Sequence, residues 1–293
     1  MSQAVRVTRP AASRGSGAAA GSGARPVGFR HVLRAEWTKL WTLSAPRWLL
    51  LAAAAGTIAV STAAAAAFSC APAHGGCTQA VTGADPAKLA LTGVYLGQAV
   101  TAALGVLAIG GEYDTGMIRV TLAAMPRRLT VLAAKALLVA GWAVAAGLAA
   151  VGGSLLAGRL ILPGRGLTAA DGYALLSLGN GPDLRAAAGS VLYLALIALL
   201  ALGITTALRD SAVGAGTVLG LLYLFPVVTT VIPDHVLARH LDQFSPMIAG
   251  MYTQVTVGVS ALPLTPWQGL GVTAAWAAGA LLLGAALLRL RDA

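Results

Sequence analysis

Long stretches of this sequence carry no charge. Six windows contain no Lys, Arg, Asp or Glu and consist largely of Ala, Leu, Val and Gly. The windows are 48–84, 89–111, 136–158, 186–208, 211–233 and 243–288. An α-helix rises about 1.5 Å per residue, so each window is long enough to cross a hydrocarbon core of about 30 Å. The pattern therefore predicts transmembrane helices.

Two of the windows are longer than one span requires. The first continues past residue 68 into a Pro- and Gly-containing stretch around His74, which predicts an outer loop. The last is interrupted by Pro246, Pro263 and Pro266, so residues 234–266 are expected to form outer-face or re-entrant structure. Six spans remain, at 48–68, 89–111, 132–158, 186–208, 211–232 and 267–288. The expected fold is an all-α membrane protein.

Composition supports this prediction. Hydrophobic residues make up 57% of the 293 residues and charged residues only 10%, against roughly 25% charged residues in soluble domains. The net charge of +10 raises the alternative of nucleic-acid binding. No platform of interleaved aromatic and basic residues accompanies the charge, which argues against nucleic acid as a partner.

The distribution of Lys and Arg predicts the orientation. Most of the 20 basic residues lie before the first span, between the second and third spans, or near the C-terminus. The positive-inside rule then places both ends in the cytoplasm (N-in, C-in) of a multi-pass protein of the cell membrane. Residues 1–28 have no periodic apolar face and are expected to be a disordered basic tail. Residues 29–293 would form the transmembrane domain.

A first amphipathic stretch, residues 29–43, precedes the first span. Its apolar and aromatic residues recur at helical spacing, with basic residues between them. The pattern favours an interfacial helix over a simple charged flank, and its candidate residues are Glu36, Trp37, Lys39 and Trp41. Glu36 is expected to pair with Lys39 or to face solvent.

A second amphipathic stretch, residues 111–135, separates the second and third spans. Met117, Ile118, Leu122 and Met125 recur at roughly helical spacing. The helix would begin at an N-cap on Asp114 or Thr115 and would stop at Pro126. We predict a short amphipathic helix at the cytoplasmic membrane surface. Glu112, at its start, either has a functional role there or only stabilises the start of the helix.

Motifs for catalysis or for energy coupling are missing. The predicted windows lack the ionisable residues with which carriers bind a driving ion. The chain also has no GxxxxGK[ST] phosphate-binding loop, and neither HExxH nor GxSxG occurs. We expect a protein that is not an enzyme, that binds no cofactor of its own, and that depends on a partner for energy if it transports.

Cys70 and Cys77 are the only cysteines, and both fall in the first outer loop. A disulfide between them and a pair of free thiols are both compatible with the sequence. With His74 they have no recognised metal-ligand spacing, so no metal site is predicted. Gly93 with Gly97, and Gly216 with Gly220, have the GxxxG spacing of close helix contacts.

Two short passages resemble a known family. Residues 36–40, Glu-Trp-Thr-Lys-Leu, are similar to the Glu-x-x-Lys-Leu stretch that opens many ABC-2 type transporter permeases, especially actinobacterial ones. The second passage is similar to the segment between spans 2 and 3 of that family. Its matching residues are Glu112, Tyr113, Gly116, Ile118, Arg119, Pro126, Arg127 and Arg128.

The resemblance implies a permease subunit of an ABC exporter. Such a subunit pairs with a second permease subunit, in a homodimer or a heterodimer, and with cytoplasmic ATPase subunits that bind the ATP. Glu112, Tyr113, Gly116, Ile118 and Arg119 would then form the short coupling helix that docks on the ATPase. The alternatives are a partner-independent channel or carrier, and a membrane anchor or regulator that transports nothing. The sequence does not identify a substrate.

Overall fold

The computed structural model describes residues 29–42, 44–68, 85–118, 120, 128–168 and 176–290. Every regular element among them is helical. Six helices are long and apolar enough to cross a membrane. They are α2 (Ser44–Ala67), α4 (Val94–Asp114), α6 (Arg128–Ile161), α7 (Gly181–Leu208), α8 (Ser211–Val231) and α11 (Pro266–Leu290). The chain is therefore an all-α membrane protein, as the sequence predicts.

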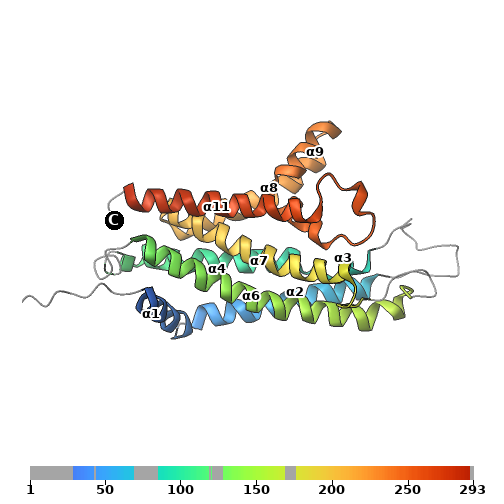
Figure 1. Cartoon of the computed structure of the whole chain (residues 1–293), viewed down its shortest axis with the longest axis horizontal. Helices are drawn as coiled ribbons and strands as arrows, with labels where there is room; N and C mark the ends of the chain where they lie inside the picture. The colour runs from blue at the N-terminus through green and yellow to red at the C-terminus, as the bar shows by residue number, and fades with distance from the viewer. Residues whose placement is uncertain are drawn as a thin grey trace, which may run out of the picture.

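Helices α1 and α3 lie at opposite ends of this bundle (Figure 1). At one end, here called the α1 end, α1 (Phe29–Thr42) packs against α6. The turn from α7 to α8 and the last residues of α11 lie at the same end of the bundle. The opposite α3 end holds α3 (Pro86–Ala90) and η2 (Leu162–Arg165). Between α8 and α11 come α9 (His235–Phe244), α10 (Pro246–Met251), η4 (Tyr252–Gln254) and η5 (Val259–Ala261).

The helix at the centre of the core is α7. It is the most buried of the six long helices, and it packs against α11, α4, α6 and α8. Tyr193, Ile197 and Leu200 on α7 are fully buried. A Cβ atom at Gly105 of α4 would lie only 2.1 Å from the carbonyl oxygen of Ala198, so the two backbones touch there. Lipid is as apolar as these side chains, so close packing of this kind is what holds membrane helices together.

The second predicted span begins later than expected. Residues 86–90 form α3, residues 91–93 form a turn, and α4 starts only at Val94. The Gly93–Gly97 pair faces α2, where a Cβ atom at Gly93 would lie 1.9 Å from the Thr57 carbonyl oxygen. A Cβ atom at Gly216 or Gly220 would meet nothing within 4 Å. Of the two GxxxG patterns, only the first is therefore a close helix contact.

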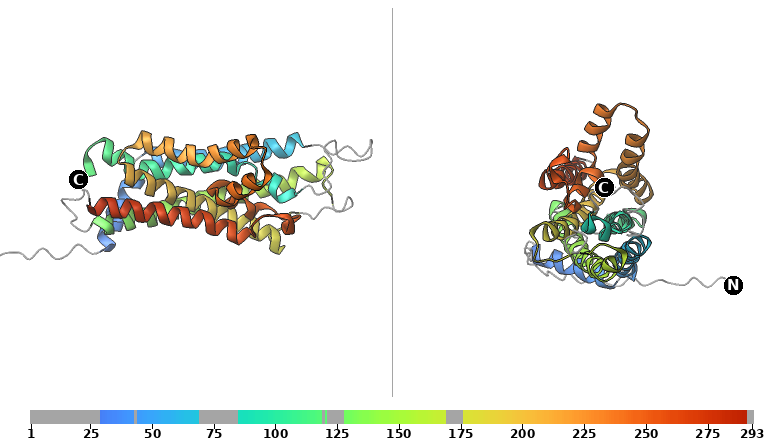
Figure 2. Two further views of the ribbon diagram at one scale, coloured as in Figure 1. Left: turned by 90° about the horizontal axis from the view of Figure 1, so that it is seen from above. Right: turned by 90° about the vertical axis from the view of Figure 1, so that its right-hand side faces the viewer.

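The predicted outer-face or re-entrant region separates into two parts. We call residues 246–261 the α10–η5 segment. Its α10 and η4 are largely buried among α7, α8 and α11. By contrast, α9 projects from the side of the bundle (Figure 2). Its N-cap is Asp234, whose carboxylate accepts hydrogen bonds from the backbone N–H groups of Val236 and Leu237.

Candidate functional site

The most unusual side chain in the bundle is Lys135. It lies in the second turn of α6, on the face that also carries the buried Val131, Leu132 and Leu138. Only 3% of the residue is exposed. An ammonium group in such surroundings must have its charge compensated and all three N–H donors bonded.

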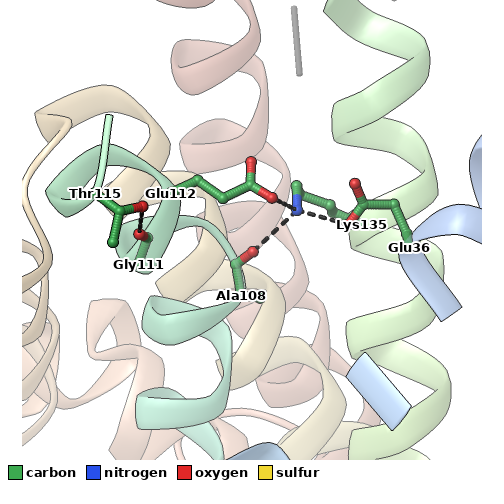
Figure 3. Close-up of polar contacts among 6 residues, drawn as sticks. All are labelled: Glu36, Ala108, Gly111, Glu112, Thr115 and Lys135. Carbon is green, nitrogen blue, oxygen red and sulfur yellow. Dashed lines mark hydrogen bonds and ion pairs between the residues drawn. The ribbon is translucent and has the colours of Figure 1, made fainter. Parts of the chain in front are cut away.

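Lys135 finds all three acceptors inside the protein (Figure 3). Its Nζ donates to Glu36 Oε2 at 2.6 Å, to Glu112 Oε1 at 2.7 Å and to the Ala108 carbonyl oxygen at 3.2 Å. Glu36 comes from α1, Glu112 and Ala108 from α4, and Lys135 from α6. We call Glu36, Glu112 and Lys135 the charge cluster. It joins three separate helices at one nitrogen atom.

Burial of the charge cluster has a large desolvation cost, which the contacts within the cluster offset. Glu36 is 5% exposed and Glu112 is 4% exposed, so all three groups have left water. The desolvation cost of a buried ion pair can equal its Coulombic gain, although removal of one partner is strongly destabilising. Short contacts of 2.6 and 2.7 Å are those of charge-assisted hydrogen bonds. The cluster therefore selects one arrangement of α1, α4 and α6 over others.

Helix α1 delivers Glu36 to this position through its apolar face. Val32, one turn earlier, is buried against Val131 and Ala134 of α6. Trp37 is 48% exposed, yet its ring lies 5.5 Å from that of Trp142 at an interplanar angle of 48°. The expectation that Glu36 faces solvent is wrong, because the residue is only 5% exposed. Its expected pairing with Lys39 falls on a side chain outside the described ones. The reason is tertiary: α1 packs along α6 and turns the carboxylate toward Lys135.

Residues flanking the charge cluster reach the remaining helices at the α1 end. Asp114, the last residue of α4, accepts a short hydrogen bond from Ser211 Oγ at the start of α8. Tyr113 Oη lies 3.5 Å from the Thr206 carbonyl oxygen of α7. Arg128 Nη1 donates to the Leu288 carbonyl oxygen of α11 at 3.0 Å. That carbonyl is in the last turn of its helix, where carbonyl groups lack helical partners.

The predicted coupling helix lies largely outside the described residues. Thr115 is the C-cap of α4, and its hydroxyl donates back to the Gly111 carbonyl oxygen at 2.6 Å. Gly116 follows with a φ of 69°, a left-handed conformation that favours glycine. Both proposed N-cap residues, Asp114 and Thr115, thus make other contacts. Ile118 is buried beside Ile109 and Leu132.

Several predicted residues have no described position or side chain. Arg119 lies outside the described residues, as do Cys70 and Cys77, and the side chains of Lys39 and Trp41 are not described. Within the described part of the chain, no three His, Cys, Asp or Glu side chains gather in a group that could hold a metal ion.

A second polar site, which the sequence did not reveal, lies at the α3 end. Asp85 is the N-cap of α3 and accepts from the backbone N–H groups of Ala87 and Lys88, both at 3.1 Å. The same carboxylate accepts from the Val257 N–H at 3.0 Å, from Thr256 Oγ1 at 2.7 Å, and over a short distance from the Thr256 N–H. One side chain thus holds α3 and the α10–η5 segment together.

Other side chains satisfy the backbone around that segment. Arg185 Nη2 of α7 donates to the Val255 carbonyl oxygen at 2.6 Å. From α11, Thr273 Oγ1 donates to the Pro246 carbonyl oxygen at 2.8 Å, and Trp276 Nε1 to that of Phe244 at 2.9 Å. Backbone that leaves helical geometry at membrane depth needs such partners, because lipid offers none.

The projecting helix α9 carries one acid turned back toward the bundle. Burial raises the pKa of Asp242 above its usual range, while a hydrogen bond with Thr229 acts in the opposite direction. Its Oδ1 has no hydrogen-bond partner among the residues that the structure describes. Burial, with a smaller contribution from the Asp242 charge, raises the pKa of Tyr252 to about 12.

The sequence matches no protein-family model and no curated protein sequence that it was compared with. Inference about function therefore rests on the residues and their arrangement.

Proposed function

We propose that this chain is the membrane-spanning permease subunit of an ATP-driven exporter, energised by a separate cytoplasmic ATPase. Two things support the proposal. One is the resemblance of residues 36–40 and 111–128 to ABC-2 type permeases. The other is the arrangement of polar contacts around residues 111–135, which is what a force-receiving element requires.

The arrangement of those contacts is the observation that carries the proposal. Side chains at the two borders of the passage, from Glu112 to Asp114 and from Arg128 to Lys135, contact α1, α7, α8 and α11. They belong to α4 and α6 themselves. A displacement of residues 115–127 by a docked protein would therefore reach six helices through direct contacts. A connection that merely links two spans would not need them.

A second candidate function is an ion-coupled carrier, and the charge cluster is the specific observation in its favour. Glu112 and Lys135 belong to the long apolar helices α4 and α6, where ionisable groups often mark ion pathways. However, all three Lys135 donors are already bonded inside the protein, which is expected of a joint between helices. Uptake by purified, ATPase-free protein in vesicles under an imposed proton gradient would favour this second candidate.

The first test is isolation of the intact protein from its native membrane under mild detergent. We expect co-purification of a protein that hydrolyses ATP and carries a GxxxxGK[ST] loop. Met117→Asp and Val120→Asp should weaken this association about tenfold or more, because each places a charge on an exposed apolar side chain of the proposed docking surface.

The matched control is Val236→Asp on α9. Val236 is 66% exposed and Val120 is 69% exposed, but α9 lies far from the α1 end. This control should leave the association unchanged. The proposal fails if no such ATPase is recovered, or if the control weakens the association as much as the two variants do. Glu112 is unsuited to this test, since its substitution would disturb the buried charge cluster.

A further inference from the structure

A partly enclosed cavity lies at the α3 end, with walls formed by α3, α4, α8, α10 and η4. Its volume is about 190 Å³. An engineered protein cavity of about 150 Å³ is large enough to bind benzene, so this cavity has room for a ring with one small substituent. The lining residues that bear on the choice of ligand are Lys88, Tyr95, Met247, Ile248, Met251 and Tyr252.

Hydrogen bonds between elements hold the walls of this cavity in place. The Asp85 carboxylate joins α3 to the α10–η5 segment. Gln98 Nε2 of α4 donates to Met247 Sδ of α10 at 3.3 Å. The Tyr223 hydroxyl of α8 donates to the Tyr95 carbonyl oxygen of α4 at 2.6 Å. Because these contacts order the walls before a ligand arrives, binding would cost little further ordering of the protein.

The polar side chains of the lining, those of Lys88, Tyr95 and Tyr252, can all donate hydrogen bonds. None of the three side chains hydrogen-bonds or forms an ion pair with another residue in the described part of the chain. Burial raises the pKa of Tyr252 to about 12, so its hydroxyl keeps its hydrogen at neutral pH. Three donors thus border one cavity, and a ligand with acceptor oxygens would satisfy them.

The charge of the lining favours an anion. Lys88 is the only charged residue that lines the cavity. Two carboxylates are close by, but neither belongs to the lining. Asp85 is already bonded to N–H and O–H groups of α3 and the α10–η5 segment. Asp242 acts on Tyr252 through its charge alone.

The rest of the lining suits an aromatic ring. The thioethers of Met247 and Met251 stand in the same walls as the rings of Tyr95 and Tyr252. Sulfur atoms make favourable contacts with ring edges, and aromatic rings pair with one another in offset or edge-to-face arrangements. An aliphatic ligand of the same volume gains neither kind of contact.

We propose that this cavity binds a small aromatic carboxylate of about the size of benzoate. Its carboxylate would accept from Lys88 and the tyrosine hydroxyls, and its ring would lie between Met247 and Met251. The site is separate from the charge cluster, and the proposal does not depend on whether the chain is a permease.

The ligand test uses para-fluorobenzoate, observed by fluorine NMR with the full chain in phosphatidylcholine nanodiscs. We expect its resonance to broaden more than with empty nanodiscs, and an excess of unlabelled benzoate should remove the difference. The alcohol para-fluorobenzyl alcohol has the same ring and no charge. Its Kd should be about fivefold higher, because it lacks the charge-assisted contact with a partly hydrated ammonium group.

Two pairs of variants locate the bound probe. Lys88→Met should raise the Kd of para-fluorobenzoate about fivefold, and Lys88→Arg should restore most of the affinity. Arg165→Met, at an exposed basic residue of the same end that does not line the cavity, should have no effect. Ile248→Trp should abolish binding by filling the cavity, whereas Val257→Trp, at an exposed residue outside the lining, should not.

Three results would overturn the proposal. Equal affinity of the unsubstituted protein for the acid and the alcohol would exclude recognition of the charge, even if a variant misfolds. Displacement of the probe when phosphatidylglycerol is added to the nanodiscs would mean that a lipid headgroup occupies Lys88. Displacement by cyclohexanecarboxylate as effective as that by benzoate would show that the cavity does not select an aromatic ring.

Discussion

Polar contacts join neighbouring elements at both ends of the bundle, but the contacts differ in their chemistry. At the α1 end, the charge cluster joins three regular helices, and its two short contacts run between oppositely charged side chains. At the α3 end, Asp85 and Arg185 bind backbone groups of the non-helical stretch 255–257. There a single ionised side chain serves several neutral partners, and no opposite charge is required.

This difference determines how much stability a single substitution should cost at each end. In the charge cluster, two carboxylates share one ammonium group. Loss of Lys135 therefore leaves two buried negative charges without a cation, whereas loss of one glutamate leaves a balanced pair. Around the α10–η5 segment, the contacts are separate hydrogen bonds from α3, α7 and α11. The loss of any one of these bonds leaves no opposite charge unpaired, so it should cost less than the loss of Lys135.

The largest effect should come from Lys135→Met, which leaves Glu36 and Glu112 buried together without a cation. We expect a loss of about 3–5 kcal/mol of unfolding free energy, measured by equilibrium unfolding in mixed micelles. The triple variant Glu36→Gln, Glu112→Gln, Lys135→Met should recover most of that loss, since no charge remains. Lys88→Met, at an exposed lysine of the α3 end, is the control. Full stability of Lys135→Met would contradict the account of the cluster.

Asp85→Ala should have an intermediate effect, about 3 kcal/mol, because it removes an N-cap and the charge-assisted bonds to Thr256 and Val257. Asp234→Ala removes only an N-cap, that of α9, and should cost about 1 kcal/mol. Amide hydrogen exchange across residues 255–261 should accelerate in the first variant alone. If both variants cost the same, Asp85 does not hold the segment.

Asp242→Asn should have the smallest effect, and its sign is opposite. The pKa of Asp242 is raised in the folded protein, so ionisation at neutral pH costs more in the folded state than in the unfolded state. The unfolding free energy of the parent protein therefore falls as the pH rises from 3.8, the ordinary pKa of this carboxyl group, through the raised pKa of Asp242 in the folded state. We expect a small gain in the unfolding free energy of Asp242→Asn at pH 7 that disappears below about pH 4. A variant less stable than the parent at pH 7 would contradict this.

The sequence predicted the regular parts of the fold well. Charge-free windows located the six long helices because a bilayer imposes both length and apolarity on any span. It did not separate α3 from α4, because the apolar pattern continues across the turn at 91–93. The N-cap of α3, Asp85, lies before the charge-free window and did not mark the break. The helix at 29–42 was predicted from its spacing, within one residue of its observed end.

The polar joints could not be predicted from the sequence, for a physical reason. Lys135 is separated from Glu36 by 99 residues, and no local pattern states which carboxylate a lysine will meet. The available signal was a lone lysine at the helical spacing of Leu132, Leu138 and Val139, which favours a buried position. Asp85 and Thr256 are likewise 171 residues apart. Such pairs are set by packing, after the helices have found their neighbours.

The members of the charge cluster are synthesised at different times. Both glutamates leave the ribosome before Lys135, and 23 residues separate Glu112 from it. At roughly 5–20 residues per second, that interval lasts about 1–5 s. During it, Glu112 lacks the cation that it meets in the folded protein. We therefore expect the joint between α1, α4 and α6 to form only after Lys135 has been made, while α7, α8 and α11 are still to follow.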